Sequence, residues 1–379
     1  MKRVGIGSRN YTYRRVSYDL PVGGYEFRKV PYIPYRRFFP QRPGLSHRWS
    51  FLPFARVDLF HLWNGFLTGS RKWVVGFESQ FPRYLGIPRD GAYHYAVEQA
   101  GAKGCGAILP MSDYARNLFV TMNQGLLSSE HEEKTTVFHG AVPVHEERSR
   151  KGLEEKAAET EALQFCMVGH DFFRKGGVPV LRAFRRIRQT HPQARLIVVS
   201  AVEGNDYVTG TDGESVGRAK KELSDSPGGT WHPRLPHAEV LQLLAASHFA
   251  LLPTLDDTYG WSVLEAMSVG TPVITTDVCA LPELVKDGQN GFQIELEKGE
   301  NRRWIGMGEP AGSQQRSECL EAAYEIIEEA LCKLVAGLAN PQQQSCQLGE
   351  QALAHVRHQH DPESQGRKLA DVYDRVLAS

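Results

Sequence analysis

The chain has 379 residues, of which 41% are hydrophobic and 23% are charged, so it is long enough to bury two hydrophobic cores. Its 44 basic and 44 acidic residues cancel, and this balance argues against a nucleic-acid partner. The charge is uneven, however, because residues 1–60 hold ten Arg and two Lys against three acidic residues.

The six cysteines form no CxxC pair and no tight framework, which predicts free or buried thiols in a reducing compartment. No apolar run is long enough to span a bilayer, and the first residues lack the apolar stretch of a signal peptide. We therefore expect a cytoplasmic protein, or one bound to the inner face of a membrane.

Apolar runs in the first half predict a set of strands and helices. Helices are expected at 91–101 and 112–124, and strands at 2–8, 58–63, 72–79, 105–112 and 135–143. Residues 24–44 carry four prolines among aromatic and basic side chains, which predicts a long loop. The fingerprint of a dinucleotide site is incomplete, because Asn10 stands in the place of its third glycine. We assign residues 1–150 to a first domain.

Residues 145–161 are charged and lack apolar periodicity, so we place a linker there. From this point strands alternate with helices, which predicts parallel βαβ units and a doubly wound sheet in a second domain at 160–358. Strands are expected at 163–170, 194–202, 248–254, 271–277 and 291–296, and helices at 176–191, 235–247, 261–270 and 280–288. A last helix at 362–378, within residues 360–379, has an apolar face that we expect to pack on the first domain.

The loop at 168–177 follows a strand and precedes a helix, at the strand end where doubly wound sheets bind ligands. Arg174 and Lys175 add cations, the glycine pair that follows allows close approach, and the helix start offers free N–H groups. These features predict a phosphate site. The alternative is a pair of solvated cations on a loop.

The segment from Asp256 to Ile274 also turns from a buried strand into a helix, at Tyr259-Gly260. Asp257 and Glu265 stand on either side of that turn. One interpretation is local: Asp257 caps the helix, and Glu265 interacts with the helix dipole from the first turn. The other is a ligand site shared with the loop at 168–177.

Residues from about 163 to 296 resemble the donor-binding domain of family 4 glycosyltransferases, which are retaining enzymes of the GT-B fold that use nucleotide sugars. The motifs stand in the order of that family: CMVGHDFFRKGG, DDTYGWSVLEAMSVGTPVI and LPELVKDGQNGF are similar to its glycine loop, its acid-x7-acid signature and its closing motif. The resemblance implies an α/β protein with two Rossmann-like, doubly wound domains that face each other across a cleft.

The resemblance also implies roles for residues. Lys175 should bind the donor diphosphate, Glu265 the ribose hydroxyls and Asp257 the donor sugar. Three consecutive backbone amides should cap the sugar and phosphate: those of Tyr259, Gly260 and Trp261.

The chain departs from the family at two positions. Asp257 stands where Glu is usual, so its reach is shorter and Asp256 is a candidate substitute. His170 stands where Arg is usual beside the glycine, so we expect His170 to contribute a pH-sensitive contact to the donor phosphates and Arg174 to supply the second cation.

The first half resembles the acceptor domain of a GT-B enzyme only loosely. We expect four of its residues to line the cleft, with His61 and Glu78 near the chemistry: His61, Asn64, Glu78 and Arg83. The alternatives are a satisfied core histidine at His61 and a structural ion pair between Glu78 and Arg83.

The expected activity is retaining transfer of a sugar from a UDP-, GDP- or similar nucleotide sugar to a glycan or lipid-linked acceptor, in polysaccharide or glycolipid synthesis. No metal or other cofactor is expected, since the DxD motif is absent. An epimerase, a sucrose-type synthase and a non-catalytic partner subunit are the alternatives. The basic and aromatic residues within 1–60 suit an anionic membrane surface. The alternatives are a solvated basic loop whose aromatic side chains pack inward and a pocket for an anionic soluble acceptor.

Overall fold

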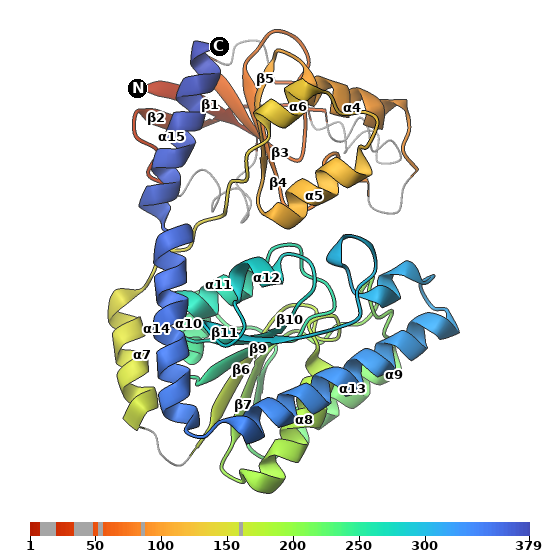
Figure 1. The fold of residues 1–379 in the computed structure, drawn as a ribbon, viewed down its shortest axis with the longest axis vertical. Helices are drawn as coiled ribbons and strands as arrows, with labels where there is room; N and C mark the ends of the chain where they lie inside the picture. Colours follow the sequence, from red (N-terminus) through yellow and green to blue (C-terminus); the bar gives the residue numbers. More distant parts are fainter. Residues whose placement is uncertain (8–19, 34–47, 52–55, 85–87, 159–161) are drawn as a thin grey trace. The chain divides into compact units, whose positions relative to one another are not determined.

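The computed structural model describes residues 1–7, 20–33, 48–51, 56–84, 88–158 and 162–379 (Figure 1). The chain divides into two compact units, Met1–Pro143 with Gln359–Ser379, and Val144–His358. Each unit contains one parallel sheet flanked by helices, so the predicted α/β class with two Rossmann-like sheets is confirmed.

The first unit contains a five-stranded sheet in the order β2-β1-β3-β4-β5, and every pair of neighbouring strands is parallel. The strands are β1 (Lys2–Ile6), β2 (Tyr25–Lys29), β3 (Leu59–Trp63), β4 (Trp73–Phe77) and β5 (Cys105–Pro110). The order reverses between β1 and β3, where doubly wound sheets form a crevice at the carboxyl ends of their strands.

Two expectations for this sheet are wrong. Residues 25–29 lie inside the stretch predicted as a long loop, yet they form β2, because Tyr25 and Phe27 pack against Tyr373. Residues 135–143 form no strand. Thr136 and Phe138 each donate one backbone hydrogen bond to β5, at 2.9 and 2.8 Å, but no continuous ladder develops.

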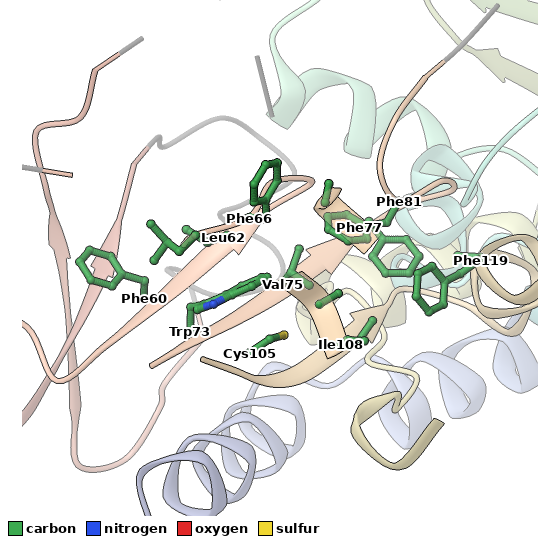
Figure 2. Packing of buried hydrophobic residues seen from close by; sticks show 14 of the residues in the cluster. Phe60, Leu62, Phe66, Trp73, Val75, Phe77, Phe81, Cys105, Ile108 and Phe119 are labelled. Atoms are coloured by element: carbon green, nitrogen blue, oxygen red, sulfur yellow. The ribbon is translucent and has the colours of Figure 1, made fainter. Parts of the chain in front are cut away.

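The core of the first unit lies between the sheet and the helices α4 (Gly91–Gly101) and α5 (Asp113–Met122), with the short helix α6 (Ser129–Lys134) beside them. Figure 2 shows aromatic and aliphatic side chains from β3, β4 and α5 in this core. Phe77 packs on both Phe81 and Phe119, with ring centroids 5.7 and 5.6 Å apart. Burial within a parallel sheet accounts for the continuous apolar run of β4 and for the largely apolar sequence of β3, which His61 interrupts.

The C-terminal helix α15 (Pro362–Ala378) packs on the same sheet, although it is far away in the sequence (Figure 1). Its predicted apolar face is buried, with Leu369, Val372, Tyr373 and Val376 at 0–5% exposure. Gly106 in β5 permits this contact, because a Cβ at that position would overlap the Val376 side chain.

The second unit contains a six-stranded parallel sheet in the order β11-β10-β9-β6-β7-β8. The strands are β6 (Gln164–Val168), β7 (Arg195–Val199), β8 (Gly229–His232), β9 (Phe249–Leu252), β10 (Val273–Thr276) and β11 (Gly291–Ile294). The edge strand β8 was missing from the prediction, because its residues are only partly buried and form no apolar run.

Helices flank this second sheet, and α8 packs on α13, α7 on α10 and α10 on α11. They are α7 (Glu146–Ala158), α8 (Gly177–Thr190), α9 (Gly213–Asp225), α10 (His237–Ala245), α11 (Trp261–Ser268), α12 (Leu281–Leu284), α13 (Gln314–Gly337) and α14 (Pro341–Gln359), with 3-10 turns η2 (Glu300–Arg302) and η3 (Ile305–Gly308).

The linker expected at 145–161 is wrong, because Glu146–Ala158 is helix α7 and belongs to the second unit. Its buried face consists of polar or small residues, which hid the helix from a search for apolar periodicity. Lys156 is 1% exposed and donates a 2.7 Å hydrogen bond to the carbonyl of Gly270. Burial lowers the pKa of Lys156 to about 8.

Among the described residues, no helix is both long and apolar enough to cross a membrane. All six cysteines are free thiols, and Cys105, Cys166 and Cys279 are buried, as predicted.

Candidate functional site

The loops at 168–177 and around Asp257 meet where the strand order of the second sheet reverses, between β6 and β9. Strands β6 and β9 are neighbours, and the chain continues from them to opposite sides of the sheet. Their carboxyl ends therefore lie side by side at the position where open α/β sheets bind ligands. The amide of Leu255 and the hydroxyl of Thr254 donate to the carbonyl of Arg174, at 2.9 and 3.1 Å, and tie the two loops together.

Lys175 from the first loop forms an ion pair with Asp257 from the second, between Nζ and Oδ2. Both residues are buried, each with 8% exposure. Burial alone would raise the pKa of Asp257, but the charges of Lys175 and Arg174 outweigh it and lower that pKa overall. Asp257 is therefore held as a carboxylate, and Lys175 is neutralised by a partner that an anionic ligand can replace.

Asp257 also closes the turn that precedes α11. Its Oδ1 accepts the backbone N–H groups of Tyr259 and Gly260, at 3.2 and 2.9 Å. The N-cap of α11 is Gly260 and no side chain caps the helix, so the local interpretation of Asp257 as the helix cap is wrong. Two of the amides expected to face a donor are bonded to Asp257. Trp261 is the first residue of α11, and its ring lies 4.9 Å from that of Tyr259.

Glu265 lies in the second turn of α11, so the expectation that it acts on the helix dipole from the first turn is wrong. Its side chain is 9% exposed, and Oε1 is 2.9 Å from Nε2 of His237. A buried carboxylate beside a helix start, with a polar partner, is suited to accept hydrogen bonds from hydroxyl groups.

Asp256, the candidate substitute for Asp257, makes other contacts within the chain. It is 3% exposed, and its carboxylate accepts the hydroxyl of Tyr207, the thiol of Cys279 at 3.4 Å and an ion pair with Arg303 at 3.5 Å. Its neighbour Asp257 is the acid that reaches Lys175.

Arg174 is held close to this cluster. Its guanidinium pairs with Asp171, donates a 2.6 Å hydrogen bond to the carbonyl of Asp256 and lies 5.5 Å from the ring centroid of Tyr207. The side chain of Arg174 is 13% exposed. His170, by contrast, is exposed, and its carbonyl accepts a hydrogen bond from Ser200. The second cation at this edge of the sheet is thus Arg174.

Two glycines permit the close approach of backbone at the site. Gly176 and Gly260 precede α8 and α11 with φ of +82° and +92°, a region that favours glycine. A Cβ on Gly176 would overlap the carbonyl oxygen of Pro253, and one on Gly260 would lie 2.9 Å from a methyl of Leu281.

His61 is a core residue of the first unit, so the expectation that it lines a cleft is wrong. Alternate residues of β3 point to opposite faces of the sheet: Phe60 and Leu62 enter the core of Figure 2, and His61 faces α15. Its Nδ1 is 2.6 Å from the hydroxyl of Tyr373, and its exposure is 1%. Burial lowers the pKa of His61 to about 3.

The other three residues proposed for the first unit follow strands at the carboxyl edge of its sheet. Asn64 follows β3 with φ of +48°, and its amide donates a 2.8 Å hydrogen bond to the carbonyl of Gly76. Glu78 follows β4 and is half-buried, and Arg83 is exposed. Asn64 and Glu78 therefore lie at the edge of the sheet where a ligand is expected, and Arg83 comes later in the chain after β4.

Sequence reasoning missed four residues that the fold brings to this site: Tyr207, His237, Cys279 and Arg303. They come from loops after β7, β10 and β11 and from the start of α10. Cys279 has φ of +53°, which is unusual for a residue with a Cβ. No sequence motif marks these positions, because each one reaches the site through a separate loop.

Among the described residues, no group of three or more His, Cys, Asp or Glu is arranged to hold a metal ion. Three side chains place positive charge at this edge of the sheet: Lys175, Arg174 and Arg303.

Residues 149–300 match the family model for "Glycosyl transferases group 1". A glycogen synthase of Mycobacterium tuberculosis is 29% identical over 133 residues, covering 35% of this chain and 30% of the relative. A D-inositol 3-phosphate glycosyltransferase of Corynebacterium jeikeium is 30% identical over 149 residues, covering 39% and 35%. The matches thus span about a third of the length of these curated relatives.

Solved structures resemble the chain over its whole length. Sucrose-phosphate synthase from Thermosynechococcus elongatus has a TM-score of 0.63 at 15% identity, with 100% of both chains covered. The Anabaena protein HepE, in complex with UDP and glucose, has a TM-score of 0.58 at 13% identity and covers 99% of this chain and 100% of its own. At these identities the likeness establishes the fold alone.

The chain has the GT-B fold, with one parallel sheet in each of its two α/β units. Within the second unit, residues 149–300 resemble the group 1 glycosyl transferases, in agreement with the resemblance to family 4.

Proposed function

We propose that the protein is a retaining glycosyltransferase, which moves a sugar from a nucleoside-diphosphate sugar to a glycan or lipid-linked acceptor. The observation that carries the proposal is the meeting of Lys175, Asp257 and the turn before α11 at the carboxyl ends of β6 and β9. This constellation lies in the segment that matches the group 1 family model.

The chemical groups of the donor suggest where each part of it binds. Its diphosphate displaces the Asp257 carboxylate from the ammonium of Lys175, near the guanidinium of Arg174 and the N-terminal ends of α8 and α11. Its ribose hydroxyls donate to Glu265, and its sugar hydroxyls to Asp257. UDP is the first nucleotide to test, because the structural neighbour HepE was solved with UDP.

Transfer with retention needs no strong protein nucleophile at this site. The bond between the anomeric carbon and the diphosphate oxygen breaks, and the acceptor oxygen bonds to the same face of that carbon. The leaving diphosphate takes the acceptor proton, while Lys175 and Arg174 stabilise the charge that develops on it. We expect no metal requirement, because these fixed cations perform that task.

The acceptor belongs to polysaccharide or glycolipid synthesis in this proposal, and the protein is cytoplasmic and peripheral to the inner face of the membrane. Support comes from the excess of positive charge in residues 1–60. Part of that region is described: Arg28 and Lys29 are exposed on β2, and Arg28 pairs with Glu26 at 3.0 Å. Residues 13–15 and 35–39, which carry most of the expected membrane contacts, lie outside the described residues.

The experiment that tests the proposal compares the wild type with Glu265→Ala in calorimetric titrations of UDP, GDP and ADP, each with EDTA present. Loss of a hydrogen bond to a charged group should raise the dissociation constant of the preferred nucleotide about tenfold or more. Glu239→Ala removes an exposed acid of α10 and should bind like the wild type.

Turnover is followed by NMR with the corresponding nucleotide sugar, again in EDTA. A product with the anomeric configuration of the donor supports retention, and an inverted product removes the family mechanism. Equal nucleotide affinity in the wild type and Glu265→Ala would refute the ribose role. Activity that returns only with Mg²⁺ would refute metal independence.

A further inference from the structure

His237, the first residue of α10, contacts the carboxylate of Glu265 in α11. Nε2 of His237 lies 2.9 Å from Oε1 of Glu265. A carboxylate only accepts hydrogen bonds, so this ring nitrogen is the donor and carries the proton. The His237 side chain is 54% exposed, whereas that of Glu265 is 9% exposed. The imidazole therefore lies on the solvent side of a nearly buried acid.

Packing, rather than a mobile surface loop, sets the place of His237. The carbonyl of Pro236, the residue before α10, accepts the amides of Glu239 and Val240 at 3.0 and 3.1 Å. At the other end of α10, the carbonyl of Leu244 accepts a 2.6 Å hydrogen bond from Thr271, just beyond α11. Because α10 is bonded at this end to the segment that follows α11, His237 and Glu265 are held in register.

A carboxylate that accepts from two neighbouring hydroxyl groups must present its plane in one orientation. The last side-chain torsion of Glu is broad, so an unsupported carboxylate samples many orientations. A donor bound to Oε1 narrows that range before a ligand arrives, which lowers the ordering cost of binding. The backbone of Glu265 is also supported, because Ser268 donates a 2.8 Å hydrogen bond to its carbonyl.

We propose that His237 is a positioning residue that orients the Glu265 carboxylate for the vicinal hydroxyls of a ribonucleoside diphosphate. This inference rests on the proposed function, since it takes Glu265 as the ribose ligand. It adds that the site distinguishes ribose from deoxyribose, and that His237 sets the size of this preference without touching the reacting atoms.

The test is a cycle of two protein changes and two ligands, measured by calorimetric titration of the full chain. The ligands are UDP and 2′,3′-dideoxyuridine 5′-diphosphate, or the guanosine and adenosine pairs where those nucleotides bind more tightly. His237→Ala should raise the dissociation constant of the ribonucleotide about three- to tenfold and leave that of the dideoxynucleotide unchanged. His237→Gln, which restores an N–H donor at a similar reach, should recover most of the lost affinity.

Gln242→Ala, at an exposed position of the same helix, is the matched control and should follow the wild type with both ligands. The inference is overturned if His237→Ala binds both ligands like the wild type, or weakens both equally, because neither result couples His237 to the ribose. Failure of the proposed function has a different signature. In that case the wild type itself binds the two ligands equally and Glu265→Ala changes nothing.

Discussion

Buried charges at the donor-side site are stable only because each has a partner. Lys175 and Asp257 are both 8% exposed, and Asp257 is further satisfied by two backbone amides. Removing one member of such a pair leaves the other charge buried and uncompensated, which typically costs about 3–5 kcal/mol. A loss of activity on substitution of Lys175 would therefore combine a folding defect with a binding defect. Substitutions of Glu265 and His237 distinguish the folding defect from the binding defect more cleanly.

His61 allows a prediction about pH at the residue scale. Its pKa is about 3 in the folded protein because of burial, against an ordinary value of 6.5. Between pH 3 and 6.5 His61 is therefore protonated in the unfolded chain but not in the folded chain. The stability contributed by neutral His61 is complete above pH 6.5 and is lost as pH falls toward 3. Between these values the wild type should lose about 1.4 kcal/mol per pH unit relative to His61→Asn.

The measurement is urea unfolding of both proteins at several pH values below neutrality. Asn keeps an acceptor near the position of Nδ1, so the Tyr373 hydroxyl still has a partner. His94→Asn, on the exposed face of α4, is the control, and its stability should differ from the wild type by a constant amount. Parallel pH profiles for the wild type and His61→Asn would contradict the assignment of a neutral core histidine.

At the scale of elements, the site depends on how closely the loop before α8 approaches the end of β9. Gly176 and Gly210 provide a matched comparison, because both have positive φ, +82° and +61°. A Cβ on Gly176 would overlap the carbonyl oxygen of Pro253, whereas a Cβ on Gly210 has no neighbour within 4 Å. Alanine at either position carries the strain of a left-handed residue, about 1–2 kcal/mol.

We therefore expect Gly176→Ala to destabilise the protein by about 1–3 kcal/mol more than Gly210→Ala, since only the first change also forces the two loops apart. Urea unfolding measures both costs, and nucleotide titration should show weaker binding for Gly176→Ala alone. Equal destabilisation by the two substitutions would mean that the approach of the loops is not tight, and would weaken the account of the site given above.

At the scale of the whole molecule, the proposed membrane surface predicts binding to anionic vesicles. The wild type should co-sediment with phosphatidylserine-containing liposomes, and added salt should reduce binding, because each basic residue near the surface contributes about 1 kcal/mol. Replacement of Arg36, Arg37, Phe38 and Phe39 by Ser should weaken it. Arg150→Ser with Lys151→Ser removes two charges from α7 and should not. Wild-type protein that stays in the supernatant at low salt would remove the membrane proposal.

What the sequence by itself determined was the class of fold and the donor-side loops, because local signals are dense there. Apolar strands, helix starts and glycine turns follow one another from residue 163, and Lys175, Asp257 and Glu265 stand within motifs of fixed spacing. The tertiary structure decided which distant segments contact each other. His61 is a core residue because α15 covers its face of β3, and α7 buries Lys156 although no apolar pattern in the sequence predicts this.

Contacts between elements that are far apart in the sequence also decided the partners within the site. Asp256 and Asp257 are adjacent and chemically alike, yet one meets Tyr207 and Arg303 and the other meets Lys175. His237 reaches Glu265 only because α10 packs beside α11. Spacing along a chain limits which residues share one strand end or helix face, but the side-chain packing of whole elements selects which of them touch.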